Sequence, residues 1–136
     1  NQHSENTKQI ISFLKKQKKV KEILYPHNPS SKNYKLWKKY YSGATGLLSI
    51  VIKSKKKSSV IKFVNSLELF GIGYSWGGFE SLAILQELRS NKKDEYIQGR
   101  KYFRFNKDEH IVRLHIGLED PKDLINDLKR SLRYIK

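Results

Sequence analysis

The sequence of 136 residues contains no cysteine and no methionine. Without cysteine it can form no disulfide, no thiolate metal site and no cysteine nucleophile, and this composition fits a cytoplasmic protein. No apolar run approaches the length of a membrane span, and the N-terminal residues lack the pattern of a signal peptide. Because the chain starts at Asn1 without an initiator methionine, we expect a fragment, a processed product or a chain prepared for expression.

Acidic residues are also scarce, with 13 Asp and Glu against 28 Lys and Arg, for a formal net charge of +15. A balance this basic raises nucleic acid or an anionic membrane surface as partners. The lysines cluster in residues 15–21 and 53–57. Because no recognised RNA- or DNA-binding motif accompanies them, we interpret them as solvated lysines from an AT-rich genome and expect no membrane partner. A basic nucleic-acid-binding module remains the alternative function.

The order of apolar segments predicts an α/β domain that spans residues 1–136 as one unit. Apolar periodicity predicts helices over 4–18, 31–41 and 58–67, and strands over 20–25, 47–53, 69–73 and 111–116. A last helix begins at Pro121, with Asp120 as its N-cap. Residues 86–107 are polar, charged and aromatic by turns, and we interpret them as a helical or irregular excursion.

Alternation along two of these strands predicts which side chains face the core. The strand over 47–53 places Leu48, Ile50 and Ile52 on one face. The strand over 111–116 places Val112, Leu114 and Ile116 on one face. Arg113 and His115 then share the opposite face. The aromatic residues of segment 31–41 recur at helical spacing, which indicates a packing face of this helix rather than a platform on which bases stack.

Residues 69–82 hold four glycines within eight residues, and these flank Ser75 and Trp76. Glycine tolerates positive φ and close backbone approach, so the segment fits a strand that turns sharply beside a ligand. The spacing matches neither the dinucleotide-binding nor the phosphate-binding glycine loop. Read from spacing alone, the segment is a glycine-rich turn that holds a buried aromatic side chain.

A second motif, Arg-Leu-His-Ile-Gly-Leu-Glu-Asp at residues 113–120, follows Tyr-Ser-Trp-Gly-Gly-Phe-Glu-Ser-Leu at residues 74–82. In wording and order the pair resembles the C-terminal domain of the pyridoxal-phosphate enzymes of cysteine and methionine metabolism, most closely the cystathionine β-lyase branch. The resemblance extends over most of the chain and includes residues 25–26, 42–49 and 123–128. It implies the small domain of a fold-type I enzyme, an α+β sandwich whose mostly antiparallel sheet carries helices on one face.

The resemblance also implies an activity, the β-elimination of cystathionine to homocysteine, pyruvate and ammonia. Family members hold pyridoxal phosphate on a lysine of a large domain, and no lysine here lies in such a context. We therefore expect no catalytic or cofactor-binding residue in this chain. Its expected role is to recognise an amino-acid thioether substrate, while a large domain or an upstream chain holds the cofactor. Without the large domain, the surface that contacts it in the parent enzyme would be exposed, which predicts self-association of this chain. A remnant of a split gene is a further interpretation.

Candidate site residues follow from the same resemblance. A strand arginine is most often solvated or paired, but the family's arginine in this motif holds the substrate α-carboxylate, a role that falls to Arg113. The family's Tyr-Ser-Trp segment lines that pocket, which implicates Ser75 and Trp76, with Tyr74 as a candidate pocket wall. Glu80 and His115 are interpreted as structural. The four histidines, His3, His27, His110 and His115, show no metal-ligand spacing, so no metal site is predicted.

Overall fold

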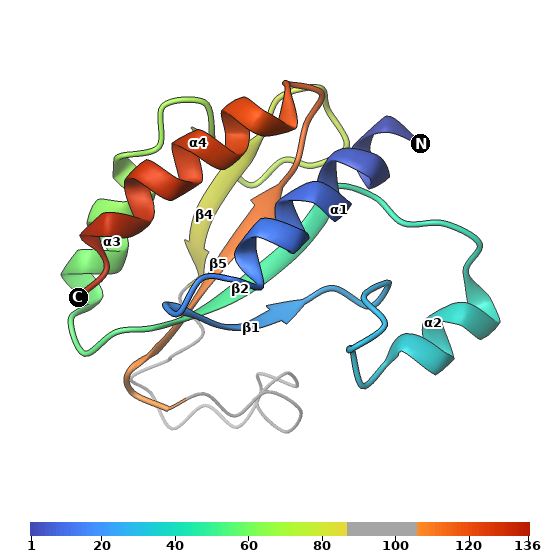
Figure 1. The fold of residues 1–136 in the computed structure, drawn as a ribbon, viewed down its shortest axis with the longest axis horizontal. Coiled ribbons are helices and arrows are strands. Elements are labelled where there is room, and N and C mark those ends of the chain that lie inside the picture. Colours follow the sequence, from blue (N-terminus) through green and yellow to red (C-terminus); the bar gives the residue numbers. More distant parts are fainter. Residues whose placement is uncertain (87–105) are drawn as a thin grey trace.

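The computed structural model describes residues 1–86 and 106–136, which form one open β-sheet with helices (Figure 1). The strands are β1 (Val20–Leu24), β2 (Leu47–Lys53), β3 (Gly71–Ile72), β4 (Leu82–Gln86) and β5 (Glu109–His115). They lie in the order β1-β2-β5-β4-β3. The pair β3–β4 is parallel and the other neighbours are antiparallel. The predicted mostly antiparallel sheet is confirmed.

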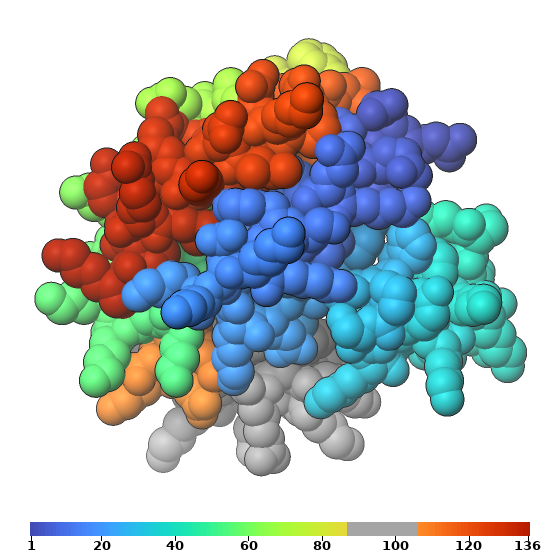
Figure 2. Space-filling model, viewed as in Figure 1, coloured from blue at the N-terminus to red at the C-terminus, as the bar shows by residue number. Residues whose placement is uncertain are grey.

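The helices of the described residues lie mainly on one face of this sheet. They are α1 (Gln2–Leu14), α2 (Tyr34–Tyr40), α3 (Lys57–Asn65) and α4 (Pro121–Ser131), which a 3₁₀ turn extends over Leu132–Tyr134. Helices α1, α3 and α4 cover the sheet, whereas α2 lies to its side (Figure 1). Figure 2 shows α1 and α4 packed side by side as the outer surface of this layer. The prediction of helices on one face is confirmed.

The core lies between the sheet and these three helices, as the strand alternation predicts. Ile50 pairs with Val112 and Leu48 with Leu114 across β2 and β5, so apolar side chains stand opposite one another. From the helices, the fully buried side chains of this cluster are those of Ile10, Leu14, Val60, Phe63, Leu124 and Leu128. Burial of this apolar surface is the main force that holds the helices on the sheet.

Helix α4 begins as its sequence predicts and ties a second segment to the sheet. The side chain of Asp120 accepts a hydrogen bond from the backbone N–H of Lys122 at 2.7 Å, which caps the helix. Further along, the buried carboxylate of Asp127 accepts the backbone N–H groups of Glu68 and Leu69 at 2.9 to 3.1 Å. Asp127 thereby holds the segment that leads into β3.

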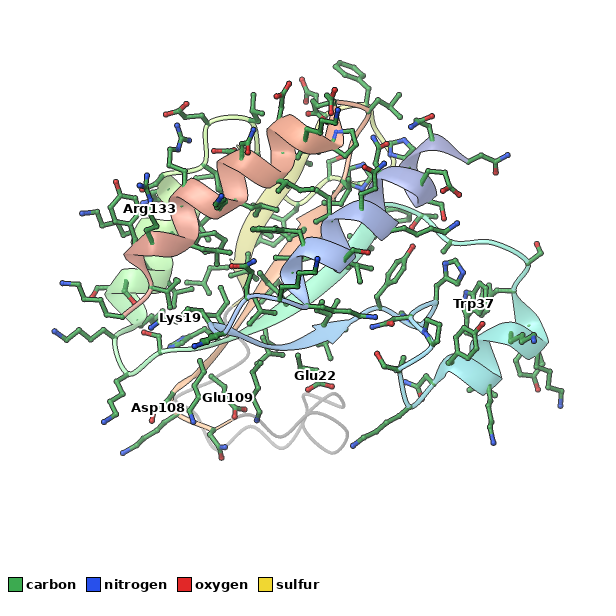
Figure 3. The ribbon with its side chains drawn as sticks, in the orientation of Figure 1. Lys19, Glu22, Trp37, Asp108, Glu109 and Arg133 are labelled. Atoms are coloured by element: carbon green, nitrogen blue, oxygen red, sulfur yellow. The ribbon has the colours of Figure 1, made fainter. Side chains whose placement is uncertain are left out.

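Two expectations from periodicity are wrong. Helix α2 is shorter than the predicted 31–41, none of its residues is buried, and Tyr40 is 64% exposed. Its aromatic side chains stack locally instead, with ring centroids 4.2 Å apart for His27 and Trp37, because two turns of helix beside the sheet cannot reach the core (Figure 3).

Strand β4 was missed, and the strand predicted over 69–73 is limited to Gly71–Ile72. The excursion predicted over 86–107 lies mostly outside the described residues.

Glu109, at the start of β5, makes the stability of this fold sensitive to acid (Figure 3). Its buried carboxylate pairs with the ammonium of Lys21 and accepts a hydrogen bond from the backbone N–H of Asn106 at 3.1 Å. These contacts, that with Lys21 first, lower the pKa of Glu109 below its ordinary value of 4.5. Its stabilising contribution is therefore complete above about pH 4.5 and is lost as the pH falls through the lowered pKa.

We expect Glu109→Gln to unfold at lower temperature than the wild type at pH 7, because it loses the charge pairing with Lys21. The difference between the two melting temperatures should narrow as the pH falls below 4.5. Thermal unfolding followed by circular dichroism from pH 3 to pH 7 measures this, with the exposed Glu22→Gln as the control. A constant difference across this range would contradict the assignment.

Candidate functional site

Arg113 lies in the middle of β5, on the sheet face opposite the helical layer. Its Cα pairs with Ser49 on β2 and with Ile84 on β4, so both neighbouring strands flank it. The guanidinium is partly exposed, donates a hydrogen bond from Nη2 to the carbonyl of Tyr74, and lies 5.6 Å from the centroid of the Tyr74 ring. Among the described residues it has no acidic partner. Most of its planar fork of donors is therefore available to a carboxylate.

The loop of residues 73–81, between β3 and β4, is bonded to β5 and the residues that follow it. His115 shares the face of Arg113, and its Nε2 lies 3.0 Å from the carbonyl oxygen of Gly78. The backbone N–H of Leu118 donates to the carbonyl of Phe79 at 2.8 Å. Because side chains alternate along a strand, Arg113 and His115 both reach toward this one loop. The end of β5 thus sets where the loop lies.

A partly buried polar network holds the C-terminal end of the loop. The hydroxyl of Ser81 donates to the Glu119 carboxylate at 2.7 Å and accepts from the backbone N–H of Gly117 at 2.8 Å. The backbone N–H of Ser81 donates to the same carboxylate at 2.8 Å. Chain contact is so close here that a Cβ on Gly117 would lie 2.1 Å from the carbonyl oxygen of Phe79. The turn itself uses Gly77, with φ of +83°.

The structure brings one of the predicted pocket residues, Tyr74, against Arg113 through its carbonyl and its ring. Ser75 and Trp76 follow in the same loop and are exposed, and neither has a hydrogen bond to Arg113 among the described residues. Trp76 is 66% exposed, so the prediction of a turn around a buried aromatic side chain is wrong.

Sequence reasoning interpreted His115 as structural and missed two other residues that build this site, Ser81 and Glu119. His115 is 2% exposed and bonded to the loop, and the buried Ser81 bonds the half-buried Glu119 at the end of the loop. The alternation of β5 already places His115 beside Arg113, which is the signal that identifies it. The contact between Ser81 and Glu119 joins positions 38 residues apart, so no local pattern predicts it.

The site has donors for a carboxylate but no group for the aldehyde of pyridoxal phosphate. Residues 63–91 and 108–121, which include β3, β4, β5 and the loop, contain no lysine to form a Schiff base. The segments around Arg113 therefore do not fit the cofactor. Among the described residues no group of three or more His, Asp or Glu side chains is arranged to hold a metal ion. No helix in this part of the chain is long and apolar enough to cross a membrane.

Curated proteins of known name match nearly the whole chain. A cystathionine β-lyase of Bordetella avium is 37% identical over 131 residues, which are 96% of this chain and 31% of that protein. An L-alanine/L-glutamate racemase of Wolbachia pipientis wMel is 34% identical, with coverage of 96% and 31%. Human cystathionine γ-lyase is 33% identical, also with coverage of 96% and 31%. The chain spans about a third of the length of these relatives.

A solved structure and a family model agree with these matches. The crystal structure of the metY protein of Campylobacter jejuni, with N′-pyridoxyl-lysine-5′-monophosphate at position 205, superposes with a TM-score of 0.71 and 29% identity. The superposition covers 96% of this chain and 27% of that one. The model of the Cys/Met metabolism PLP-dependent enzymes matches residues 1–133. The chain belongs to the Cys/Met metabolism family of pyridoxal-phosphate-dependent enzymes.

Proposed function

We propose that residues 1–136 form the substrate-recognition domain of a pyridoxal-phosphate-dependent carbon–sulfur lyase of the cystathionine β-lyase type, acting in the cytoplasm. The observation that carries the proposal is the guanidinium of Arg113, which lacks an acidic partner among the described residues and lies against the Tyr74 loop. An arginine fork of this kind binds a carboxylate through parallel N–H donors. The family match supplies a substrate with such a group, an amino acid.

In this proposal the chain binds and orients the substrate, and the remainder of the enzyme carries the cofactor. When bound there, pyridoxal phosphate supplies an electron sink for the bond that breaks at Cα. Arg113 holds the α-carboxylate and so limits rotation of the substrate about Cα, which converts binding energy into orientation. Tyr74 and Trp76, 70% and 66% exposed, form the wall that covers the bound substrate and excludes water. Ser75 contributes a hydroxyl donor beside the carboxylate.

Choice of substrate within the family rests on the loop rather than on Arg113. The matching proteins include a β-lyase, a γ-lyase and a racemase, all named for amino-acid substrates. We therefore assign carboxylate binding to Arg113 and the preference for cystathionine to the Tyr74–Trp76 segment. A racemase activity would require the same arginine and would be distinguished by loss of optical rotation from an amino acid without release of pyruvate.

We expect the 136-residue chain alone to retain no pyridoxal phosphate after dialysis and to release no pyruvate from cystathionine. The reason is that the segments forming its site contain no lysine. A visible absorption spectrum and a coupled pyruvate assay measure this. The matched positive control is a chimaera in which this chain replaces the corresponding 31% of the Bordetella avium cystathionine β-lyase. A retained cofactor band or pyruvate from the chain alone would contradict the division of roles.

The alternative function, nucleic-acid binding, gains one observation from the fold. The two lysine clusters meet at one end of the sheet, where the backbone N–H of Lys53 donates to the carbonyl of Lys19 at 3.2 Å (Figure 3). Lysines also line α2 and α4, however, so this end is not set apart from the rest of the surface. Binding of a random-sequence RNA that weakens steeply with salt would favour the alternative, and retention of pyruvate release by the chimaera would favour the lyase domain.

A further inference from the structure

We propose that His115 is a positioning residue, whose neutral imidazole holds the loop of residues 73–81 at the distance from Arg113 that the substrate carboxylate requires. The inference rests on the proposed function, because it takes Arg113 as the carboxylate ligand. The role of His115 in positioning the Tyr74 loop can, however, be measured without substrate.

The hydrogen bond to Gly78 determines the tautomer of His115. A backbone carbonyl can only accept, so the ring nitrogen that lies 3.0 Å from the Gly78 oxygen, Nε2, carries the proton. The other ring nitrogen, Nδ1, is buried and has no hydrogen-bond partner among the described residues. Protonating it would bury an N–H group with no acceptor, which is costly. The structure thus favours the neutral ring with its single proton on Nε2.

Residues from α1 and from the segment before β2 enclose the imidazole of His115. The ring of His3, from α1, lies with its centroid 5.3 Å away, and its Nδ1 is 2.8 Å from the carbonyl of Ile116. The carboxylate of Glu119 is bonded to Ser81. On the remaining side Gly46 gives the ring its room, because a Cβ there would lie 3.2 Å from two ring atoms. The imidazole is enclosed and has one direction in which to donate, toward the loop.

The hydrogen bond from His115 to Gly78 means that the position of the loop does not depend on Arg113 alone. Among the described residues, side chains of β5 make two hydrogen bonds to the loop, Arg113 to the carbonyl of Tyr74 and His115 to the carbonyl of Gly78. If His115 were absent, the guanidinium would be the remaining side-chain contact of β5 with the loop, and a carboxylate would compete with the loop for it. With His115 in place, Arg113 can turn its donors to the substrate while Gly78 stays anchored.

The experiment compares His115→Ala, His115→Gln and His110→Gln in the full 136-residue chain. Glutamine can donate its amide N–H to Gly78, whereas alanine cannot. His110 is the matched control, since it lies on the same strand and its Nε2 is also 3.0 Å from a backbone carbonyl, that of Ser54. Backbone amide exchange at Leu118 reports the loop contact with Phe79. Acrylamide quenching of Trp76 in a Trp37→Phe background reports exposure of the loop, since the chain has two tryptophans.

We expect His115→Ala to speed exchange at Leu118 about three- to tenfold, as for the loss of one hydrogen bond, and to increase quenching of Trp76. His115→Gln should return both towards wild type, and His110→Gln should change neither. Nitrogen NMR of the wild-type ring should show the proton on Nε2 at neutral pH, which needs no variant. Equal behaviour of the alanine and glutamine variants, or a proton on Nδ1, would overturn the proposal.

A kinetic measurement separates this inference from the proposed function. In the chimaera, His115→Ala should raise the KM for cystathionine about three- to tenfold and change kcat less. If His115→Ala changed neither amide exchange at Leu118 nor quenching of Trp76, the role of His115 would be refuted. Carboxylate binding by Arg113 would be unaffected by that result. Loop effects as expected, with no dependence of KM on Arg113, would instead refute the proposed function.

Discussion

Replacing Arg113 by lysine in the chimaeric enzyme is expected to lower kcat/KM for cystathionine by about ten- to a hundredfold. Lysine keeps the positive charge but has no planar fork, so it loses the parallel hydrogen bonds that fix a carboxylate in one orientation. It also loses the contact from Nη2 to the Tyr74 carbonyl and the contact with the Tyr74 ring. Both binding and orientation should suffer, so KM should rise and kcat should fall.

Arg133→Lys is the matched control for this change. Arg133 follows α4 in the 3₁₀ turn, where its side chain is exposed and donates to the carbonyl of Arg130 at 3.0 Å (Figure 3). We expect no change in kcat/KM for the control. Thermal unfolding of both variants shows whether the domain stays folded. Unchanged KM and kcat in a folded Arg113→Lys variant would mean that the carboxylate binds elsewhere.

Adding one methyl group at Gly117 is expected to destabilise the chain by about 1 to 3 kcal/mol, the usual cost of overpacking. A Cβ at this position would lie 2.1 Å from the carbonyl oxygen of Phe79 and 2.7 Å from the carbonyl carbon of Glu80. These are backbone atoms, so no side-chain rotation can relieve the clash, and the loop must move away from β5. We expect a lower melting temperature and faster amide exchange at Leu118, whose N–H bonds Phe79.

Gly43→Ala supplies the control for the conformational effect of alanine itself. No atom lies within 4 Å of a Cβ built on Gly43, and its φ is not positive. The control should therefore unfold within about 0.5 kcal/mol of wild type, as surface substitutions usually do. If Gly117→Ala behaved like this control, the close approach of the loop to the residues after β5 would be refuted.

The elements that the sequence predicts well are those whose partners are decided by local patterning. In strands β2 and β5 apolar residues recur at every second position, so Ile50 and Val112 were expected to face the same core, as they do. Helix α4 has both a cap at Asp120 and a clear apolar stripe, and it starts where these signals place it. Each signal is contained within a few residues, and no distant contact competes with it.

The elements that sequence reasoning missed depend on neighbours far along the chain. Strand β4 follows a glycine-rich turn and reads as one end of the motif, yet it becomes a strand because it pairs with β5 on one side and β3 on the other. In α2, aromatic side chains at helical spacing indicated a packing face, but the short helix lies beside the sheet, where the ring of Trp37 contacts that of His27. Periodicity indicates that a helix has an apolar face, but it does not indicate which part of the protein that face contacts.

For the site, the sequence identifies the family through two motifs in order, and this resemblance names Arg113 as the carboxylate candidate. It also determined that these segments lack a lysine for the cofactor, since residue identity needs no fold. The folded chain alone reveals that the Tyr74 loop lies over β5, that His115 bonds Gly78, and that Glu119 bonds Ser81. These contacts join residues more than 30 positions apart, and they form because strand pairing and helix packing first bring the two segments together.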